Sequence, residues 1–512
     1  MVSAKKSRAF SPSTGLERQD ELMKRGLVAL TVLMGIGLLL QFGCQGSATL
    51  QSNMGGSASL AIFGGDAPEC SVLSFQVDIT GVTLTPEGGA TPVTVISSSS
   101  PVTVDFAALT GFNTVLNTST VPAGTYTQAN ISLTNPQITI LDTTVTPPVA
   151  KTITTMFASG LATATVSVNI KPVLTIQANV AQGLILDFNL RKSIQTDTSG
   201  SITGAVDPAF RVHPSVVTTV KGLGEIDDLH GTVQSVSTSS TNSNFIGSFM
   251  LQLPSGRTLL INTTSKTEFE KVSGLSGLAA GMFVEIEAHV NMQGDIVAGE
   301  VEAEEQEDVS HAVLVGTVTS VSPSLGAAST FTMFVREEFP EVESVVPLRS
   351  MVTVNVTSNT ILRIAFPAQA VNEGGLTFNA NTLTQAEHVA VLVPISGTTP
   401  ASLFDAAGIV LRQHGYVGNL TGTPTISASS SLTGKFTLTI CSPSLQGEPI
   451  TVVTFPDTDF DNGLTDLTSL TSSQTLVVRG LLFYETGPLT LNGMTMAGPG
   501  WVLESGRITQ IP

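Results

Sequence analysis

The sequence predicts an all-β protein, and three observations support this fold class. Charged residues make up only 12% of the 512 residues, about half of the usual quarter. Short segments that alternate apolar and polar residues recur from residue 59 onward, separated by Gly, Pro, Asn and Ser, which is typical of strands joined by turns. One order of strands recurs three times in the second half of the chain. A chain of this length exceeds a single hydrophobic core, so several domains are expected.

Residues 1–44 predict an export signal. Met23-Lys24-Arg25 precedes an uncharged apolar run from Gly26 to Leu40, and Gly43-Cys44 follows. A basic start, an apolar stretch and a small residue before the cut are typical of a secretory signal. The apolar run is shorter than the roughly 20 residues that a membrane-spanning helix needs. Translation begins at Met1 or at Met23, and the later start gives a signal of ordinary length.

Gly43-Cys44 resembles the end of a bacterial lipobox, in which the cysteine is acylated and becomes the new N-terminus. The lipobox prefers Leu three residues before the cysteine, whereas Gln41 stands there and Leu40 lies one step earlier. The resemblance implies a lipid on Cys44 that holds the protein at the cell envelope, on the periplasmic side of the outer membrane or at the cell surface. The alternatives are an uncleaved anchor and ordinary signal cleavage.

A β-sandwich is expected over residues 59–222, after a flexible Gly/Ser linker at residues 45–58. Seven or more short strands in this span suit two packed antiparallel sheets. The expected strands cover residues 59–62, 72–84, 102–106, 126–133, 137–141, 164–170 and 184–190.

Three motifs in this segment resemble bacterial lipoproteins of the domain-of-unknown-function family 4382. They are Asp66-Ala67-Pro68, Pro122-Ala123-Gly124-Thr125-Tyr126 and Leu186-Asp187-Phe188. The resemblance covers about residues 58 to 222 and implies an immunoglobulin-like, carbohydrate-binding-like sandwich. It implies a fold and a location rather than an activity.

Three small closed barrels are expected at residues 229–311, 312–413 and 414–512, because five strand segments recur in the same order. The opening segments begin at Gly231, Gly316 and Gly415, and the second at Phe249, Phe331 and Phe436. The third segments begin at Leu260, Val352 and Ile450, the fourth at Phe283, Val389 and Leu476, and the last at Ile296, Gly408 and Gly506. The pattern resembles the domain-of-unknown-function family 5666, which implies an OB-like barrel.

The formal net charge of -18 disfavours binding to nucleic acid, because an acidic surface repels phosphates. No catalytic residue is predicted, since no nucleophile elbow, phosphate loop or zinc motif occurs. The histidines are scattered without metal-ligand or triad spacing, at His213, His230, His289, His311, His388 and His414. His230 and His414 each precede a repeated glycine and are interpreted as structural.

The sequence therefore predicts a non-catalytic envelope lipoprotein that binds or scaffolds. Its expected partners are the membrane, through the lipid anchor, and an envelope protein or glycan. One alternative is a carbohydrate-binding surface module, although sugar platforms need exposed Trp or Tyr and the chain has only one Trp and three Tyr. The other alternative is an envelope enzyme whose site assembles across loops.

The two cysteines besides Cys44 are Cys70 and Cys441. We expect both to be buried and inert. They could form a disulfide only if their distant segments meet in space.

Two acidic segments invite a comparison with cation sites. The run from Glu300 to Asp308 is expected to be a solvated strand end and linker, with capture of a divalent cation as the alternative. Asp457, Asp459 and Asp461 precede Gly463 in a segment that resembles a calcium loop. The alternative is a solvated turn, in which Phe460 takes the repeat position of Phe269 and Leu362 and packs inward. No other cofactor is expected.

The first prediction is that the mature protein starts at an acylated Cys44. Mass spectrometry of the membrane fraction should find a lipid-modified N-terminal cysteine, because the signal ends at Gly43. An unmodified N-terminus, or a Cys44→Ala protein that stays in the membrane fraction, would contradict the lipid anchor.

Overall fold

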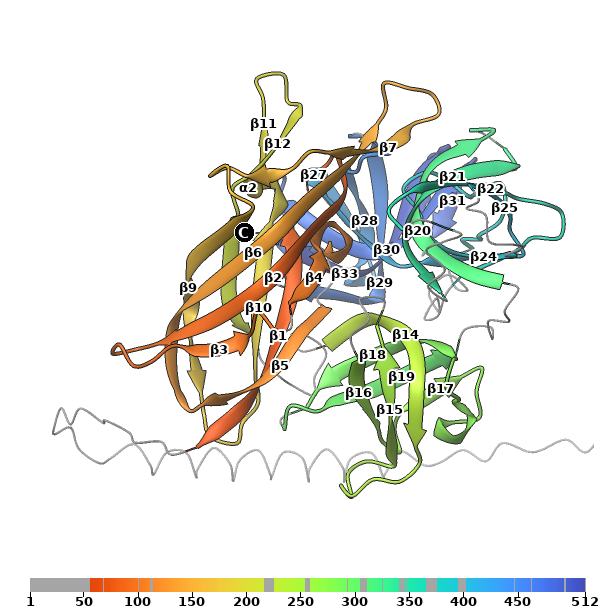
Figure 1. The fold of residues 1–512 in the computed structure, drawn as a ribbon. Helices are drawn as coiled ribbons and strands as arrows, with labels where there is room; N and C mark the ends of the chain where they lie inside the picture. The colour runs from red at the N-terminus through yellow and green to blue at the C-terminus, as the bar shows by residue number, and fades with distance from the viewer. Residues whose placement is uncertain are drawn as a thin grey trace, which may run out of the picture. The chain divides into compact units, whose positions relative to one another are not determined.

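The alternating segments form strands β1 to β33 in a computed structural model of the chain (Figure 1). The model describes residues 56–67, 69–99, 101–110, 114–215, 225–253, 258–291, 293–303, 311–324, 326–339, 346, 348–364, 375–394, 402–445, 447–461, 463–491 and 494–511. Among these residues, the helical elements are α2 and three short 3₁₀ helices. This arrangement confirms the all-β fold class. No helix in the described part of the chain is long and apolar enough to cross a membrane.

The first sheet wraps into two layers that enclose one core. One layer has the order β5-β1-β10-β13 and the other β3-β2-β6-β9, and β9 pairs with both β6 and β13. The strands are β1 (Ser57–Ala67), β2 (Val72–Pro86), β3 (Val93–Ile96), β5 (Thr114–Pro122), β6 (Gly124–Asp142), β9 (Thr163–Ile176), β10 (Gln182–Asn189) and β13 (Phe210–Ser215). We call this segment, residues 56–215, the sandwich.

Shorter elements complete the sandwich. Strand β4 pairs with β2, β7 pairs with β6, and β11, β12 and β8 form a small separate sheet. Their bounds are β4 (Val102–Asp105), η1 (Phe106–Leu109), β7 (Val149–Ile153), β8 (Met156–Phe157), α2 (Leu190–Ser193), β11 (Ile194–Thr196) and β12 (Ile202–Val206). The two layers bury Phe75, Phe106 and Phe188. The Phe188 ring stacks on the Phe75 ring, with centroids 5.0 Å apart, and on the Phe106 ring, with centroids 4.9 Å apart.

The next sheet, residues 225–303, is the first barrel. It runs in the order β16-β15-β14-β18-β19, and a parallel pairing of β16 with β19 closes it. Its elements are β14 (Glu225–Ser237), β15 (Gly247–Gln252), β16 (Thr258–Thr263), β17 (Glu268–Glu270), η2 (Leu275–Gly277), β18 (Phe283–Val290) and β19 (Ile296–Ala303).

The second barrel, residues 311–412, has the same strand order with its third and fifth strands each broken in two. Strand β22 pairs in parallel with β25, and β23 pairs in parallel with β26. Its strands are β20 (His311–Ser322), β21 (Thr330–Phe339), β22 (Met351–Asn355), β23 (Ile361–Ile364), β24 (His388–Pro394), β25 (Leu403–Asp405) and β26 (Gly408–Arg412).

The third barrel, residues 414–511, closes in the order β27-β28-β29-β33-β30. Strands β29 and β33 are again the parallel pair. Its elements are β27 (His414–Ser427), β28 (Ser430–Cys441), β29 (Pro449–Asp461), η3 (Leu467–Ser469), β30 (Thr475–Glu485), β31 (Leu489–Leu491), β32 (Met494–Met496) and β33 (Gly500–Gln510). A shared closure between the third and fifth strands thus defines all three barrels.

The expected repeat alignment is correct in the second strand and is shifted at several positions of the other strands. Gly231 and Gly316 pair with Val284 and Val389, and the residue that pairs equivalently with Leu476 is Gly418, not Gly415. His414 therefore does not occupy the position of His230. In the first barrel, the third and fourth strands are each shifted by one residue, so that Leu260 points outward and is 50% exposed.

The hydrophobic clusters continue across the boundaries between the sheets. Residues of the first barrel pack in one cluster with Phe63, Val115 and Ile185 of the sandwich. The core of the second barrel continues into Phe455 and Phe483 of the third. The four units therefore have separate sheets but share hydrophobic clusters.

The repeated glycines allow a close approach of the first two strands of each barrel. A Cβ at Gly316 would lie 2.0 Å from the Phe334 carbonyl oxygen. We predict that Gly316→Ala lowers the stability of the protein by ~1–3 kcal/mol, because the backbone must shift to admit the methyl group. Thermal unfolding measures the effect. Gly500→Ala is the control, since its Cβ meets nothing within 4 Å, and equal losses in the two variants would contradict the steric account.

Candidate functional site

Cys44, the predicted lipid attachment site, lies outside the described residues. The three aspartates of the calcium candidate lie in strand β29 and not in a loop. Asp457 is exposed and Asp461 forms an ion pair with Arg507 at 3.4 Å. In the described part of the chain, no three His, Cys, Asp or Glu side chains are grouped to hold a metal ion.

Phe460 occupies the repeat position that the sequence predicts. Its strand pairs in parallel with β33 and places Phe460 opposite Ile508, as Phe269 lies opposite Val301 and Leu362 opposite Ile409. Phe460 packs against the core of the third barrel. Side chains alternate in direction along β29, so Asp459 and Asp461 flank a Phe460 ring that points inward. This position is a structural one.

Cys70 and Cys441 form a disulfide with a Cα–Cα distance of 4.6 Å across a sequence separation of 371. Cys70 is exposed in the turn before β2, and Cys441 is half-buried at the end of β28. The expectation of two buried, inert thiols was wrong, because the fold brings the sandwich and the third barrel together at this point.

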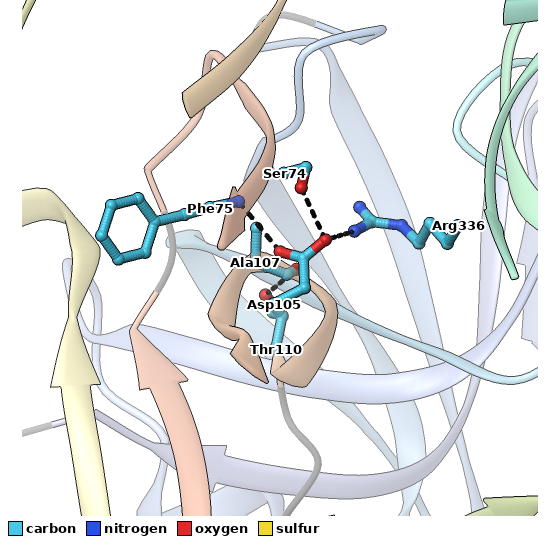
Figure 2. A network of polar contacts seen from close by, with 6 residues as sticks. All are labelled: Ser74, Phe75, Asp105, Ala107, Thr110 and Arg336. Carbon is cyan, nitrogen blue, oxygen red and sulfur yellow. Dashed lines mark hydrogen bonds and ion pairs between the residues drawn. The ribbon is translucent and has the colours of Figure 1, made fainter. Parts of the chain in front are cut away.

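A buried ion pair lies against the start of β2, a few residues after Cys70. Figure 2 shows Asp105, which ends β4, accepting hydrogen bonds from the Ser74 hydroxyl at 2.7 Å and from the Phe75 amide at 2.9 Å. The Arg336 guanidinium of β21 approaches the same carboxylate at 3.5 Å (Figure 2). The Arg336 side chain is only 9% exposed, and its burial lowers the pKa of its guanidinium while Asp105 opposes that shift. Asp105 thus joins two segments of the sandwich to the second barrel.

A second set of charged side chains joins the first and second barrels. Arg412 of β26, 3% exposed, pairs with Glu285 of β18 at 3.1 Å. His230 of β14 pairs with Glu337 of β21. Beside these pairs, Phe283 packs on an apolar patch of β20 and β24. His230 therefore contributes to a junction between barrels.

The junction of the second and third barrels is formed around the turn at residues 384–387. The Tyr416 hydroxyl donates to the Ala386 carbonyl at 3.0 Å, and the Trp501 indole donates to the Thr384 hydroxyl at 3.1 Å. Glu387 is fully buried, which raises the pKa of its carboxyl well above the usual range despite a hydrogen bond from the Thr384 amide. A neutral carboxyl suits this enclosed place.

The four Trp and Tyr side chains do not form an exposed platform. Tyr126 and Tyr416 are buried, and Tyr484 and Trp501 are half-buried with their rings 5.2 Å apart. The indole nitrogen of Trp501 donates to Thr384 at the junction of the second and third barrels. Tyr416 and Trp501 therefore support packing between the second and third barrels.

A small solvent-open groove lies on the second barrel. Strands β20, β23, β24 and β26 line it with apolar side chains, including Leu392 and Val410, and Arg363 is the charged residue of its lining. The groove lacks the converging carboxylates or imidazoles that acid–base catalysis requires.

Part of the predicted acidic run forms a carboxylate ladder on the first barrel. Strand pairing places Glu300 of β19 between Glu268 of β17 and Glu287 of β18. In the neighbouring row, Glu302 pairs with Lys271 at 2.6 Å. Burial, and then the charges of the neighbouring glutamates, raise the pKa of Glu300 to about 8. Glu300 and Glu302 thus lie in a strand, and residues 304–310 lie outside the described part of the chain.

Comparison with protein families identifies the first two units. Residues 57–203 match the model of the domain of unknown function DUF4382. Residues 230–302 match the model of the domain of unknown function DUF5666. The two matches confirm both predicted resemblances and their order along the chain. No curated protein matches this chain.

Parts of the chain are also similar to solved structures. The single-stranded DNA binding protein from Thermus aquaticus is 14% identical, with a TM-score of 0.16, and covers 40% of this chain and 93% of its own. The structure of drosophila Unr CSD456 is 10% identical, with a TM-score of 0.13, and covers 56% of this chain and 97% of its own. With TM-scores this low, neither structure bears on what this chain binds.

The carboxylate ladder predicts a stability that falls as the pH rises. Glu300 has its folded pKa raised from 4.5 to about 8, so its contribution is complete below pH ~4.5 and is lost as the pH rises through ~8. Glu300→Gln should flatten the decrease in melting temperature between these values, because the amide cannot ionise.

Thermal unfolding at a series of pH values between 4 and 9 measures this effect. Glu448→Gln, at an exposed carboxyl just before β29 of the third barrel, is the control for removal of a charge. An unchanged pH dependence in Glu300→Gln would contradict the proposed origin of the shift.

Proposed function

We propose that this chain is an exported, lipid-anchored envelope protein that acts as a non-catalytic scaffold for a partner in the envelope. The disulfide between Cys70 and Cys441 is the observation that carries the proposal. Disulfides form and persist in oxidising compartments outside the cytosol. The N-terminal signal and the lipobox-like Gly43-Cys44 support the same location.

The use of the buried charges supports a structural rather than a catalytic role. Arg336 pairs with Asp105, and Arg412 pairs with Glu285, in each case between side chains of different units. Removing one partner of a buried ion pair leaves an uncompensated charge, so such pairs hold their elements in one arrangement. These charged side chains position the units relative to one another.

The aromatic side chains favour an envelope protein over a glycan as the partner. Binding of a sugar ring commonly needs an exposed Trp or Tyr face. Trp501 and Tyr484 pack on each other, and Trp501 donates its indole hydrogen to Thr384. The structure therefore lends less support to the carbohydrate-binding module than to a protein scaffold.

Cell fractionation combined with thiol alkylation tests the proposed location. The wild-type protein should be found in the membrane fraction, and Cys70 and Cys441 should react with an alkylating reagent only after reduction. The Cys44→Ala protein should be absent from the membrane fraction, and its Cys70–Cys441 disulfide should remain. A wild-type protein in the cytosolic fraction with both thiols reactive before reduction would contradict export.

A further inference from the structure

The segment at residues 70–75, which we call the β2 start, contacts both the second and the third barrel. Cys70 is bonded to Cys441 of the third barrel. Leu73 packs on Phe334 of β21. Ser74 and Phe75 donate hydrogen bonds to the Asp105 carboxylate, which faces Arg336 of β21. Six consecutive residues thus combine a covalent bond, an apolar contact and a buried ion pair.

The contacts of the β2 start differ in their access to solvent. Cys70 is exposed, whereas Leu73 and Phe334 are 1% and 0% exposed. The Arg336 side chain is 9% exposed. Cys70 is therefore accessible to a reagent in solution, which reaches the Phe334–Arg336 surface only after the sandwich and the second barrel have separated at the β2 start.

We propose that the Cys70–Cys441 disulfide is a redox-released clasp, whose reduction lets the sandwich separate from the second and third barrels at the β2 start and uncovers the surface around Phe334 and Arg336. The β2 start is paired with β6 and is part of the sandwich sheet, so the covalent bond restrains the sandwich where Leu73 covers Phe334. Loss of this restraint leaves the Asp105 ion pair and the contacts of Leu73 and Leu141 with Phe334 to hold the junction. When the junction opens, these contacts are lost. Water then hydrates the Arg336 guanidinium, which is shielded from water while the junction is closed.

The reducing step requires a dithiol. One thiolate of the dithiol attacks the sulfur of Cys70, a mixed disulfide forms, and the Cys70–Cys441 bond breaks. Cys441 leaves as a thiolate and takes up a proton. The second thiolate of the dithiol then attacks the mixed disulfide and releases Cys70. The dithiol is oxidised to a disulfide, and the cystine is reduced to two thiols.

Hydrogen exchange of the full-length protein, oxidised or treated with dithiothreitol, tests the clasp. The Phe75 amide is the reporter, because it donates to the Asp105 carboxylate that faces Arg336 across the junction. Reduction should speed its exchange on the order of tenfold, together with that of the Phe334 region, as this junction opens locally. The Ile261 amide, in a closed sheet of the first barrel, should keep its rate.

Two variants separate the clasp from general destabilisation. Cys441→Ser should give the fast Phe75 exchange without any reductant. Asp105→Asn should speed Phe75 exchange while the disulfide stays intact. Should Cys441→Ser fail to fold, reduction of the folded wild-type protein supplies the measurement.

Equal Phe75 exchange in the oxidised and reduced proteins would overturn the proposal, as would two free thiols in the native protein. Acceleration of Ile261 to the same extent would also overturn it, because the effect would then be global. The location of the protein in the cell is measured independently, so the two proposals can fail separately.

Discussion

The arrangement of the units depends on a guanidinium that is buried between the sandwich and the second barrel. Arg336 remains charged at physiological pH, and a buried charge without a counterion is costly. Asp105 supplies that counterion, while Ser74 and Phe75 satisfy its oxygens. The carboxylate can do so only if β2, β4 and β21 hold fixed relative positions. The same need of a buried guanidinium for a counterion explains the Glu285–Arg412 pair between the first and second barrels.

The barrels meet a second constraint, which is to leave few backbone edges unpaired. Each joins its third and fifth strands in parallel, so the sheet closes on itself. Closure removes the exposed edges at which sheets aggregate. The outer faces of the barrels are then available for contacts with neighbouring units, and Phe283, Phe455 and Phe483 are used in this way.

Periodicity in the sequence predicts the elements of this fold better than it predicts their register. The common position of Phe269, Leu362 and Phe460 follows from alternation and is confirmed by the strand pairing. Gly415 was aligned in place of Gly418, because both precede apolar strand residues. The pairing of Gly418 with Leu476, and the Thr439 carbonyl oxygen 2.4 Å from a Cβ at Gly418, distinguish the two.

The junctions could not be predicted from the sequence. Asp105, Arg336 and Arg412 belong to no motif, and their partners lie in other units of the chain. The pairing of Cys70 with Cys441 likewise depends on a meeting of segments that no local pattern encodes. By contrast, the absence of a metal or triad pattern among the histidines is visible in the sequence, and His230 acts at a junction.

A double-mutant cycle on Asp105 and Arg336, followed by thermal unfolding, tests the central claim most directly. Asp105→Asn alone should destabilise the protein by ~3–5 kcal/mol, because it removes the carboxylate that attracts the buried Arg336 guanidinium most strongly. Asp105→Asn combined with Arg336→Met should recover most of that loss. Additive losses in the two single variants would show that the charges do not depend on each other, and would contradict the account.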